Sequence, residues 1–248
     1  MEAMINFLIS VIFGGLVAAI LGIIVGIPAL RLRGDYLAIV TLAFGEIVRT
    51  VFMNLPSELF GGTLGLPTPR FNRKYLFLLA FAFVLLCLMV IQNLMRSKHG
   101  RAITSIRDNE IAARATGINV TKYKLLVFTL SAFFAGVAGA LFSYANNTIQ
   151  SAKFDYNYSI EILVMVVLGG LGSINGSIIA AALITYVNIT LQTILPGDLA
   201  VLKNILYALL LIGIVIYKNA PALKTFREKY SFANLKKLGK EFLSDGDK

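Results

Sequence analysis

The sequence predicts an all-α fold: a polytopic bundle of transmembrane helices with a broken or re-entrant helix pair and a short helix in one loop. Hydrophobic residues make up 57% of the chain and charged residues 15%, whereas soluble globular domains contain about 25% charged residues. The mean hydropathy is +0.77. Several apolar runs reach the roughly 20 helical residues that one bilayer crossing requires. The chain is therefore expected to be embedded in a membrane.

The apolar runs predict the helices in chain order. One long run, Ile160–Leu195, is interrupted by the sequence GGLGSINGS. The runs end near residue 217, so we assign residues 1–217 to a transmembrane domain and residues 218–248 to a basic C-terminal tail. Single spans are predicted at Ile5–Leu30, Tyr36–Met53, Tyr75–Met95, Leu125–Ala145 and Leu199–Tyr217.

The basic residues predict the orientation. The net charge is +10, and lysine and arginine collect in the cytoplasmic loops of membrane proteins, so this charge does not call for nucleic-acid binding. The loop of residues 96–124 and the tail are the most basic segments and are expected in the cytoplasm. The loop Asn146–Ser159, with only Lys153, is expected outside. This orientation places three basic residues on the outer side of the membrane, where the positive-inside rule does not expect them: Arg70, Arg73 and Lys74.

This orientation constrains the interrupted run Ile160–Leu195. The run must begin and end outside, because the span that follows it leads inward to the tail. It therefore crosses an even number of times as two short helices, or it enters and returns as a re-entrant hairpin. Glycine permits sharp turns, so the turning point is predicted at Gly169, Gly170, Gly172 and Gly176.

Small residues at four-residue spacing predict close contacts between helices. Gly22 and Gly26 form a GxxxG in the first span. Such spacing lets helix backbones approach each other where lipid provides no hydrophobic drive for association. Packing within the chain and contact with another subunit both explain it. Two further rows lie in the fourth span: Ser131, Ala135 and Gly139, and beside it Ala132, Gly136 and Ala140.

The loop of residues 96–124 contains a predicted short helix at about Asn109–Thr116. Asp108 is expected to cap its N-terminus, Glu110 to interact with the positive end of the helix dipole, and Gly117 to follow its C-terminus. A two-turn helix is marginal alone in water, and we expect its packing partner to lie outside its own loop. Its apolar side is predicted to consist of Ile111, Ala112, Ala115 and Ile118.

Enzymatic functions find no support in the sequence. The single cysteine, Cys87, excludes an intrachain disulfide, and the single histidine, His99, lacks cysteine or clustered carboxylate neighbours for a metal site. No Ser–His–Asp arrangement and no GxxxxGK[ST] phosphate-binding loop is evident. The chain itself is therefore expected to bind no cofactor and to catalyse no reaction.

Several segments resemble a known family. DNEIAARATGI resembles the EAA-type loop of ABC importer permeases. IPALRLRGDYLAIVTLAFGEIVR, GRAITSIRDNEIAARATGINVTKYKLLVFTLSAFFAGVAGALF and SIEILVMVVLGGLGSINGS resemble, in the same order and spacing, the LivM branch of branched-chain amino-acid permeases. The resemblance covers about Gly26 to Tyr217. Family members carry further N-terminal spans before RLRGDYLAIVTL. This chain is therefore interpreted either as a protein in which those helices are dispensable, or as a fragment or the product of a late start.

The resemblance implies a multi-pass permease subunit of an importer in the bacterial inner membrane. It implies that the loop of residues 96–124 seats its short helix in a groove of a separate ATPase, which uses ATP and Mg²⁺. The implied partners are a homologous LivH-like permease, two ABC ATPase subunits, an extracytoplasmic substrate-binding protein and membrane lipid, with no nucleic acid. The implied coupling residues are Arg107, Asp108, Glu110, Ala112, Ala113 and Gly117.

Candidate residues of the translocation pathway lie in the second span and in the interrupted run. Glu46 and Arg49 share one helix face, and ionisable residues inside a span tend to face protein or water and to be functional. Mutual ion pairing is the preferred interpretation, with pathway lining as the alternative. The glycine break forms either a substrate-binding broken helix or a tight turn. The candidates are Tyr36, Glu46, Arg49, Gly169, Gly170 and Gly172.

The predicted function is the permease subunit of an ATP-driven importer for branched-chain amino acids, with the pathway formed together with a second permease. Two alternatives remain open. One is a permease of the same family for urea, short amides or other amino acids. The other is a self-sufficient secondary transporter or channel with Glu46 as its ion site.

Overall fold

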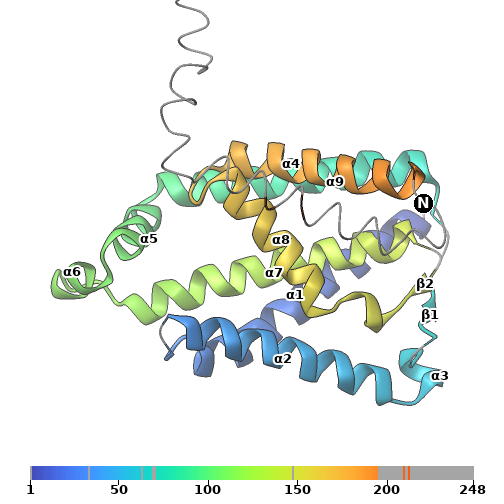
Figure 1. Cartoon of the computed structure of the whole chain (residues 1–248), viewed down its shortest axis with the longest axis horizontal. Coiled ribbons are helices and arrows are strands. Elements are labelled where there is room, and N and C mark those ends of the chain that lie inside the picture. Colours follow the sequence, from blue (N-terminus) through green and yellow to red (C-terminus); the bar gives the residue numbers. More distant parts are fainter. Residues whose placement is uncertain are drawn as a thin grey trace, which may run out of the picture. The chain divides into compact units, whose positions relative to one another are not determined.

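The computed structural model describes residues 2–32, 34–62, 64–68, 71–146 and 148–194, together with 209 and 212. The chain divides into two compact units, residues 1–156 and 157–248, and each is described by itself. Within these described residues, the regular structure is helical apart from one pair of two-residue strands, which confirms the all-α prediction (Figure 1). The predicted span Leu199–Tyr217 lies outside the described residues except at 209 and 212, and the tail of residues 218–248 lies wholly outside them.

The first unit contains most of the helices that the structure describes. Its strands pair antiparallel, with Leu66 opposite Ile149 and Pro67 opposite Thr148. The elements are α1 (Glu2–Ala29), α2 (Asp35–Asn54), α3 (Ser57–Phe60), β1 (Leu66–Pro67), α4 (Arg73–Arg96), α5 (Lys98–Asp108), α6 (Glu110–Ala115), α7 (Val120–Ala145), β2 (Thr148–Ile149) and the 3₁₀ turn η1 (Ser151–Lys153).

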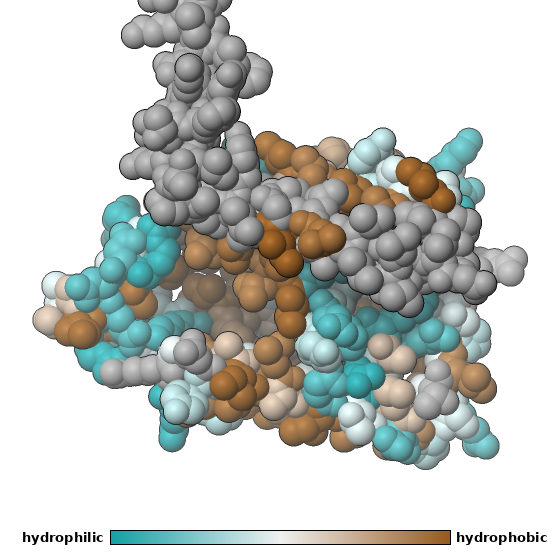
Figure 2. Space-filling view, in the orientation of Figure 1, coloured by the Kyte–Doolittle hydropathy of each residue, from teal (hydrophilic) through white to brown (hydrophobic). Residues whose placement is uncertain are grey.

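Within the described residues, five helices are long and apolar enough to cross a membrane. Four of them, α1, α2, α4 and α7, match the predicted spans, and α9 is the fifth. Their apolar side chains are largely exposed, as expected of helices that lipid covers. The end of the first unit that carries α5 and α6 has a mainly hydrophilic surface (Figure 2).

The core of the first unit lies where α1 and α7 run side by side, and Leu76 of α4 belongs to the same buried cluster (Figure 1). A methyl group added to Gly22 would lie only 2.6 Å from the Cβ of Ala132, and one added to Gly136 would overlap Ala18. The predicted row Ala132, Gly136 and Ala140 therefore packs within the chain. The neighbouring row differs, because Ser131 and Ala135 are exposed.

The second unit contains the predicted broken helix pair, α8 (Tyr156–Gly169, which begins at the last residue of the first unit) and α9 (Ile174–Ile194). Gly170 and Gly172 adopt φ values of +102° and +91°, which only glycine adopts without strain, so the predicted turning point is confirmed. A Cβ on Gly176 would collide with the carbonyl of Gly169, so the two helices meet closely at the turn.

The two helices of this pair are unequal. α8 has 14 residues, fewer than the roughly 20 that a bilayer crossing requires, whereas α9 has 21. The expectation of two short helices is therefore wrong for α9. The orientation of the spans stays a prediction.

Candidate functional site

The loop between α4 and α7 is built from two short helices where the sequence predicted one. The hydroxyl oxygen of Ser97 accepts from the backbone N–H groups of His99 at 3.1 Å and Gly100 at 3.3 Å. This cap starts α5 directly after α4 ends. Ser97 is a favoured N-cap residue and was the available sequence signal for the helix that the prediction missed.

The N-terminal cap of α6 is Asn109, so the prediction of Asp108 was wrong by one residue. The side-chain oxygen of Asn109 accepts the backbone N–H of Ala112 at 3.0 Å, and its backbone is extended, as a cap requires. Asp108 is instead the last residue of α5, and its carboxylate pairs with Arg107 at 2.9 Å. The helical backbone of Asp108 prevents it from starting the next helix.

The C-terminus of α6 closes as predicted. Gly117 has φ +85°, and its N–H donates to the carbonyl of Arg114 at 3.1 Å. The N–H of Ile118 donates to the carbonyl of Ala113 at 3.2 Å. These two bonds form a Schellman motif, in which glycine follows the helix because the position is left-handed.

The side of α6 that faces the protein is centred on Ala113, which does not belong to the predicted apolar stripe. Ala113 is buried together with Ile106 of α5 and Val120 of α7. The helix therefore has partners within its own loop, contrary to expectation. The reason is that α5 and α7 converge on the Ala113 side of the helix. Three members of the predicted apolar stripe form what we call the exposed face of α6: Ile111, which is 80% exposed, Ala112 and Ala115.

Glu110 connects α6 to α7. Its carboxylate accepts from Lys124 of α7 at 2.7 Å and from Arg114, one turn along α6, at 3.0 Å. The side chains of Glu110 and Lys124 are 31% and 29% exposed. Besides lying at the positive end of the α6 dipole, Glu110 thus holds α6 against the N-terminal part of α7.

Glu46 and Arg49 of α2 form the predicted ion pair. The Glu46 Oε2 lies 2.7 Å from Nη2 and 2.8 Å from Nε of Arg49. The other carboxylate oxygen, Oε1, accepts the backbone N–H of Tyr156 at 2.9 Å, so the same side chain also contacts the segment that opens α8. A groove of about 410 Å³ beside Glu46 is lined by Thr50 and Asn54.

Tyr36, another pathway candidate, lies at the start of α2 with 72% of its surface exposed. The candidates Gly169, Gly170 and Gly172 belong to the second unit, which is described by itself. That unit contains a polar contact that sequence reasoning missed. Asn188 of α9 donates to the carboxylate of Glu161 of α8 at 3.1 Å. An acidic residue inside an apolar run was the signal.

The apolar helices, the glycine-broken pair and the two-helix polar loop define a multi-pass α-helical membrane protein. The chain matches the family described as "Branched-chain amino acid transport system / permease component" over residues 1–216. It belongs to that family.

The similar curated proteins are transport permeases. The chain is 39% identical over 201 residues to the high-affinity branched-chain amino acid permease proteins LivM of Salmonella typhimurium and of Escherichia coli, covering 68% of this chain and 47% of each relative. A probable LivM of Methanocaldococcus jannaschii is 28% identical over 226 residues, covering 82% of this chain and 65% of that protein. The chain thus spans about half the length of the bacterial relatives. No solved structure matches it.

These relatives and the apolar helices place the chain in the inner membrane as a multi-pass protein.

Proposed function

We propose that this chain acts as a permease subunit of an ATP-driven importer for branched-chain amino acids. The observation that carries the proposal is the family match over residues 1–216. The translocation pathway forms between this chain and a second, homologous permease. Two ATPase subunits supply the energy, and an extracytoplasmic binding protein delivers the substrate.

Branched-chain amino acids are the preferred substrate class because the chain matches the LivM proteins over more residues, and at higher identity, than it matches a ribose permease. The LivM proteins match over 201 residues at 39% identity. The ribose import permease RbsC of Haemophilus influenzae matches over only 95 residues at 32% identity. Urea, short amides and other amino acids are the substrates that a binding assay must separate from leucine, isoleucine and valine.

The exposed face of α6 is the proposed contact with the ATPase. Ile111 is an apolar side chain, 80% exposed, on a polar loop that no membrane covers in the predicted topology. The helix that presents it is capped at both ends. Exposed apolar residues with a polar rim are typical of protein contacts, and Asp108, Glu110 and Arg114 supply that rim.

The contacts of α6 provide a route from the ATPase to the spans. A displacement of α6 acts on α5 and α7 through the buried cluster of Ala113, Ile106 and Val120. It also acts on α7 through the Glu110–Lys124 pair. Because α7 packs along α1, we expect the displacement to pass on to α1. Glu46 and Arg49, with the α8–α9 turn, are the proposed pathway elements.

Co-purification and uptake test this proposal. The tagged chain is expressed in cells with its transporter partners, extracted in a mild detergent and assayed for bound ATPase, and leucine uptake is measured in parallel. We expect Ile111→Asp to lower both ATPase recovery and uptake, because a carboxylate cannot be buried in an apolar contact without a partner. Ser105→Asp, on α5, is the control for an added charge.

Two results would contradict the proposal. One is that no ATPase is recovered with the wild-type chain although uptake is intact. The other is uptake that persists in cells depleted of ATP and that Glu46→Gln abolishes, which would favour a self-sufficient transporter instead.

A further inference from the structure

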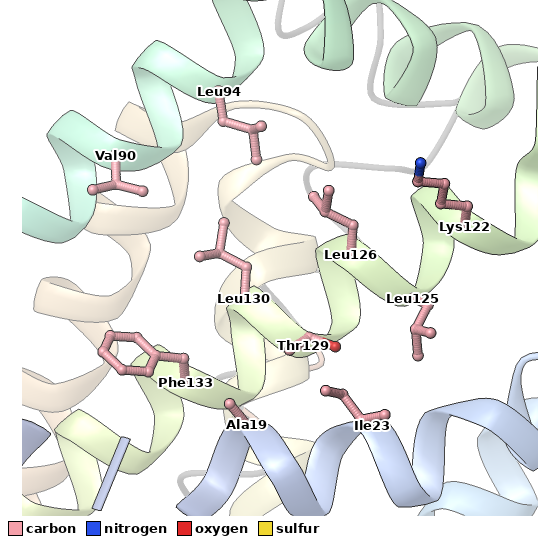
Figure 3. Close-up of a pocket in the computed structure, with 10 residues that line it drawn as sticks. All are labelled: Ala19, Ile23, Val90, Leu94, Lys122, Leu125, Leu126, Thr129, Leu130 and Phe133. Atoms are coloured by element: carbon pink, nitrogen blue, oxygen red, sulfur yellow. The ribbon is translucent and has the colours of Figure 1, made fainter. Parts of the chain in front are cut away.

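An open groove of about 640 Å³ lies between α1, α4 and α7 of the first unit. Figure 3 shows Ile23 of α1, Leu94 of α4 and Leu126 and Leu130 of α7 around it. The volume falls within the roughly 300–1,000 Å³ of small-molecule sites. The lining is apolar apart from Thr129 and the charged Lys122, which lies at the start of α7 (Figure 3).

The end of the groove at Lys122 carries further positive charge. Lys122 belongs to the first turn of α7, while Arg96 and Lys98 flank the junction of α4 and α5, two and four residues beyond the groove residue Leu94. The Tyr123 hydroxyl and His99 Nδ1 lie 3.4 Å apart, which brings the start of α5 to the start of α7. Over the described part of the chain, Arg96, Lys98 and Lys122 take part in no salt bridge.

We propose that this groove binds an anionic glycerophospholipid, with an acyl chain along the apolar lining and the phosphate at Lys122. Arg96 and Lys98 add to the positive potential that holds the headgroup. This inference goes beyond the proposed transport function and depends only on the chain lying in a membrane.

Charge complementarity selects this occupant over a helix of another subunit. A lipid combines a long apolar chain with an anion at one end, and the groove combines a long apolar lining with cations at one end. Lysine at a helix end extends its ammonium to the membrane interface, where the phosphate lies. Basic pockets between transmembrane helices bind anionic headgroups for this reason.

Native mass spectrometry of the full chain in a mild detergent tests the proposal. The probes are phosphatidylglycerol and phosphatidylcholine with the same palmitoyl and oleoyl chains, which differ in net headgroup charge. The wild type is expected to bind phosphatidylglycerol more tightly. One lysine near an anionic headgroup corresponds to about a fivefold change in affinity, so Lys122→Gln should weaken phosphatidylglycerol binding by about that factor.

Two variants separate the groove from general charge effects. Lys74→Gln removes the same charge at the opposite end of α4 and should leave the preference unchanged. Thr129→Phe fills the groove, whose lining includes Thr129, and should weaken the binding of both lipids.

Four results would overturn the proposal. The first is that the wild type shows no preference for phosphatidylglycerol, and the second is that Lys122→Gln and Lys74→Gln lose phosphatidylglycerol binding equally. The third is that Thr129→Phe binds both lipids as the wild type does. The fourth is that Leu126→Cys, in a Cys87→Ala background, cross-links to another protein chain. If Lys122→Gln does not fold, the lipid binding of Thr129→Phe tests the proposal by itself.

Discussion

Lys124 of α7 and Glu110 of α6 are 14 residues apart in the chain, and their charged groups lie 2.7 Å apart. The pair closes the loop that contains α6, and it adds to the buried contact of Ala113 with Val120. A helix of six residues would be marginal without such contacts. The position of α6 therefore depends on its neighbours more than on its own sequence.

Breaking the pair of Glu110 and Lys124 should lower leucine uptake more than it lowers the free energy of unfolding. Both side chains are about 30% exposed, so a pair of this kind contributes at most about 1 kcal/mol. Lys124→Gln is expected to leave thermal unfolding within a few degrees of the wild type. Under the proposed function it should still lower leucine uptake, because α6 loses its ion pair with α7. Lys153→Gln, which removes the same charge from an exposed side chain of η1, outside the loop of residues 96–124, is the matched control, and equal losses of uptake in the two variants would contradict this role of Lys124.

The left-handed glycine after α6 should resist substitution. Gly117 has φ +85° with open space around it, so Gly117→Ala adds strain without a collision. The expected cost is about 1–2 kcal/mol, read as a lowered thermal unfolding temperature. Gly139→Ala is the control, since Gly139 is helical and an added Cβ meets nothing within 4 Å. That variant should be neutral or slightly stabilising, because alanine favours helix by about 0.5–1 kcal/mol over glycine. A Gly117→Ala protein as stable as Gly139→Ala would refute the Schellman closure.

Glu46 and Arg49 should behave as a coupled pair. Replacing one member alone leaves the other charge unpaired within a membrane-spanning helix, where an ionisable side chain is costly. Glu46→Leu and Arg49→Met are each expected to lower the unfolding temperature, and the double variant should recover part of the loss. The double-variant comparison in detergent measures this coupling. Simple additivity of the two losses would show that the 2.7 Å contact contributes no interaction free energy.

The sequence was sufficient where a feature depends on residues close together in the chain. Long apolar runs located α1, α2, α4 and α7, and a three-residue spacing predicted the pair of Glu46 and Arg49. A lone glycine after a helical stretch correctly predicted the closure at Gly117.

The sequence was insufficient where a cap, a buried side or a contact depends on residues that lie far apart in the chain. Asp108 and Asn109 are both good cap residues, and only the end of α5 decides between them. The buried side of α6 is set by Ile106 and Val120. The contact between Glu161 and Asn188 joins residues 27 positions apart, a relationship that no local spacing rule contains.

The α1–α7 contact offers the sharpest test of the fold. A methyl group on Gly22 would lie 2.6 Å from the Cβ of Ala132, so Gly22→Ala must push the two helices apart. Overpacking of this kind costs about 1–3 kcal/mol. Gly45→Ala, on α2, makes the same chemical change where the added Cβ meets nothing within 4 Å, and it should be neutral or stabilising. Thermal unfolding of both variants in the same detergent provides the comparison. If Gly22→Ala is as stable as Gly45→Ala, the close approach of α1 and α7 at Ala132 is wrong. If it is less stable, Ala132→Gly should restore part of the loss, because it removes the methyl group that Gly22→Ala strikes.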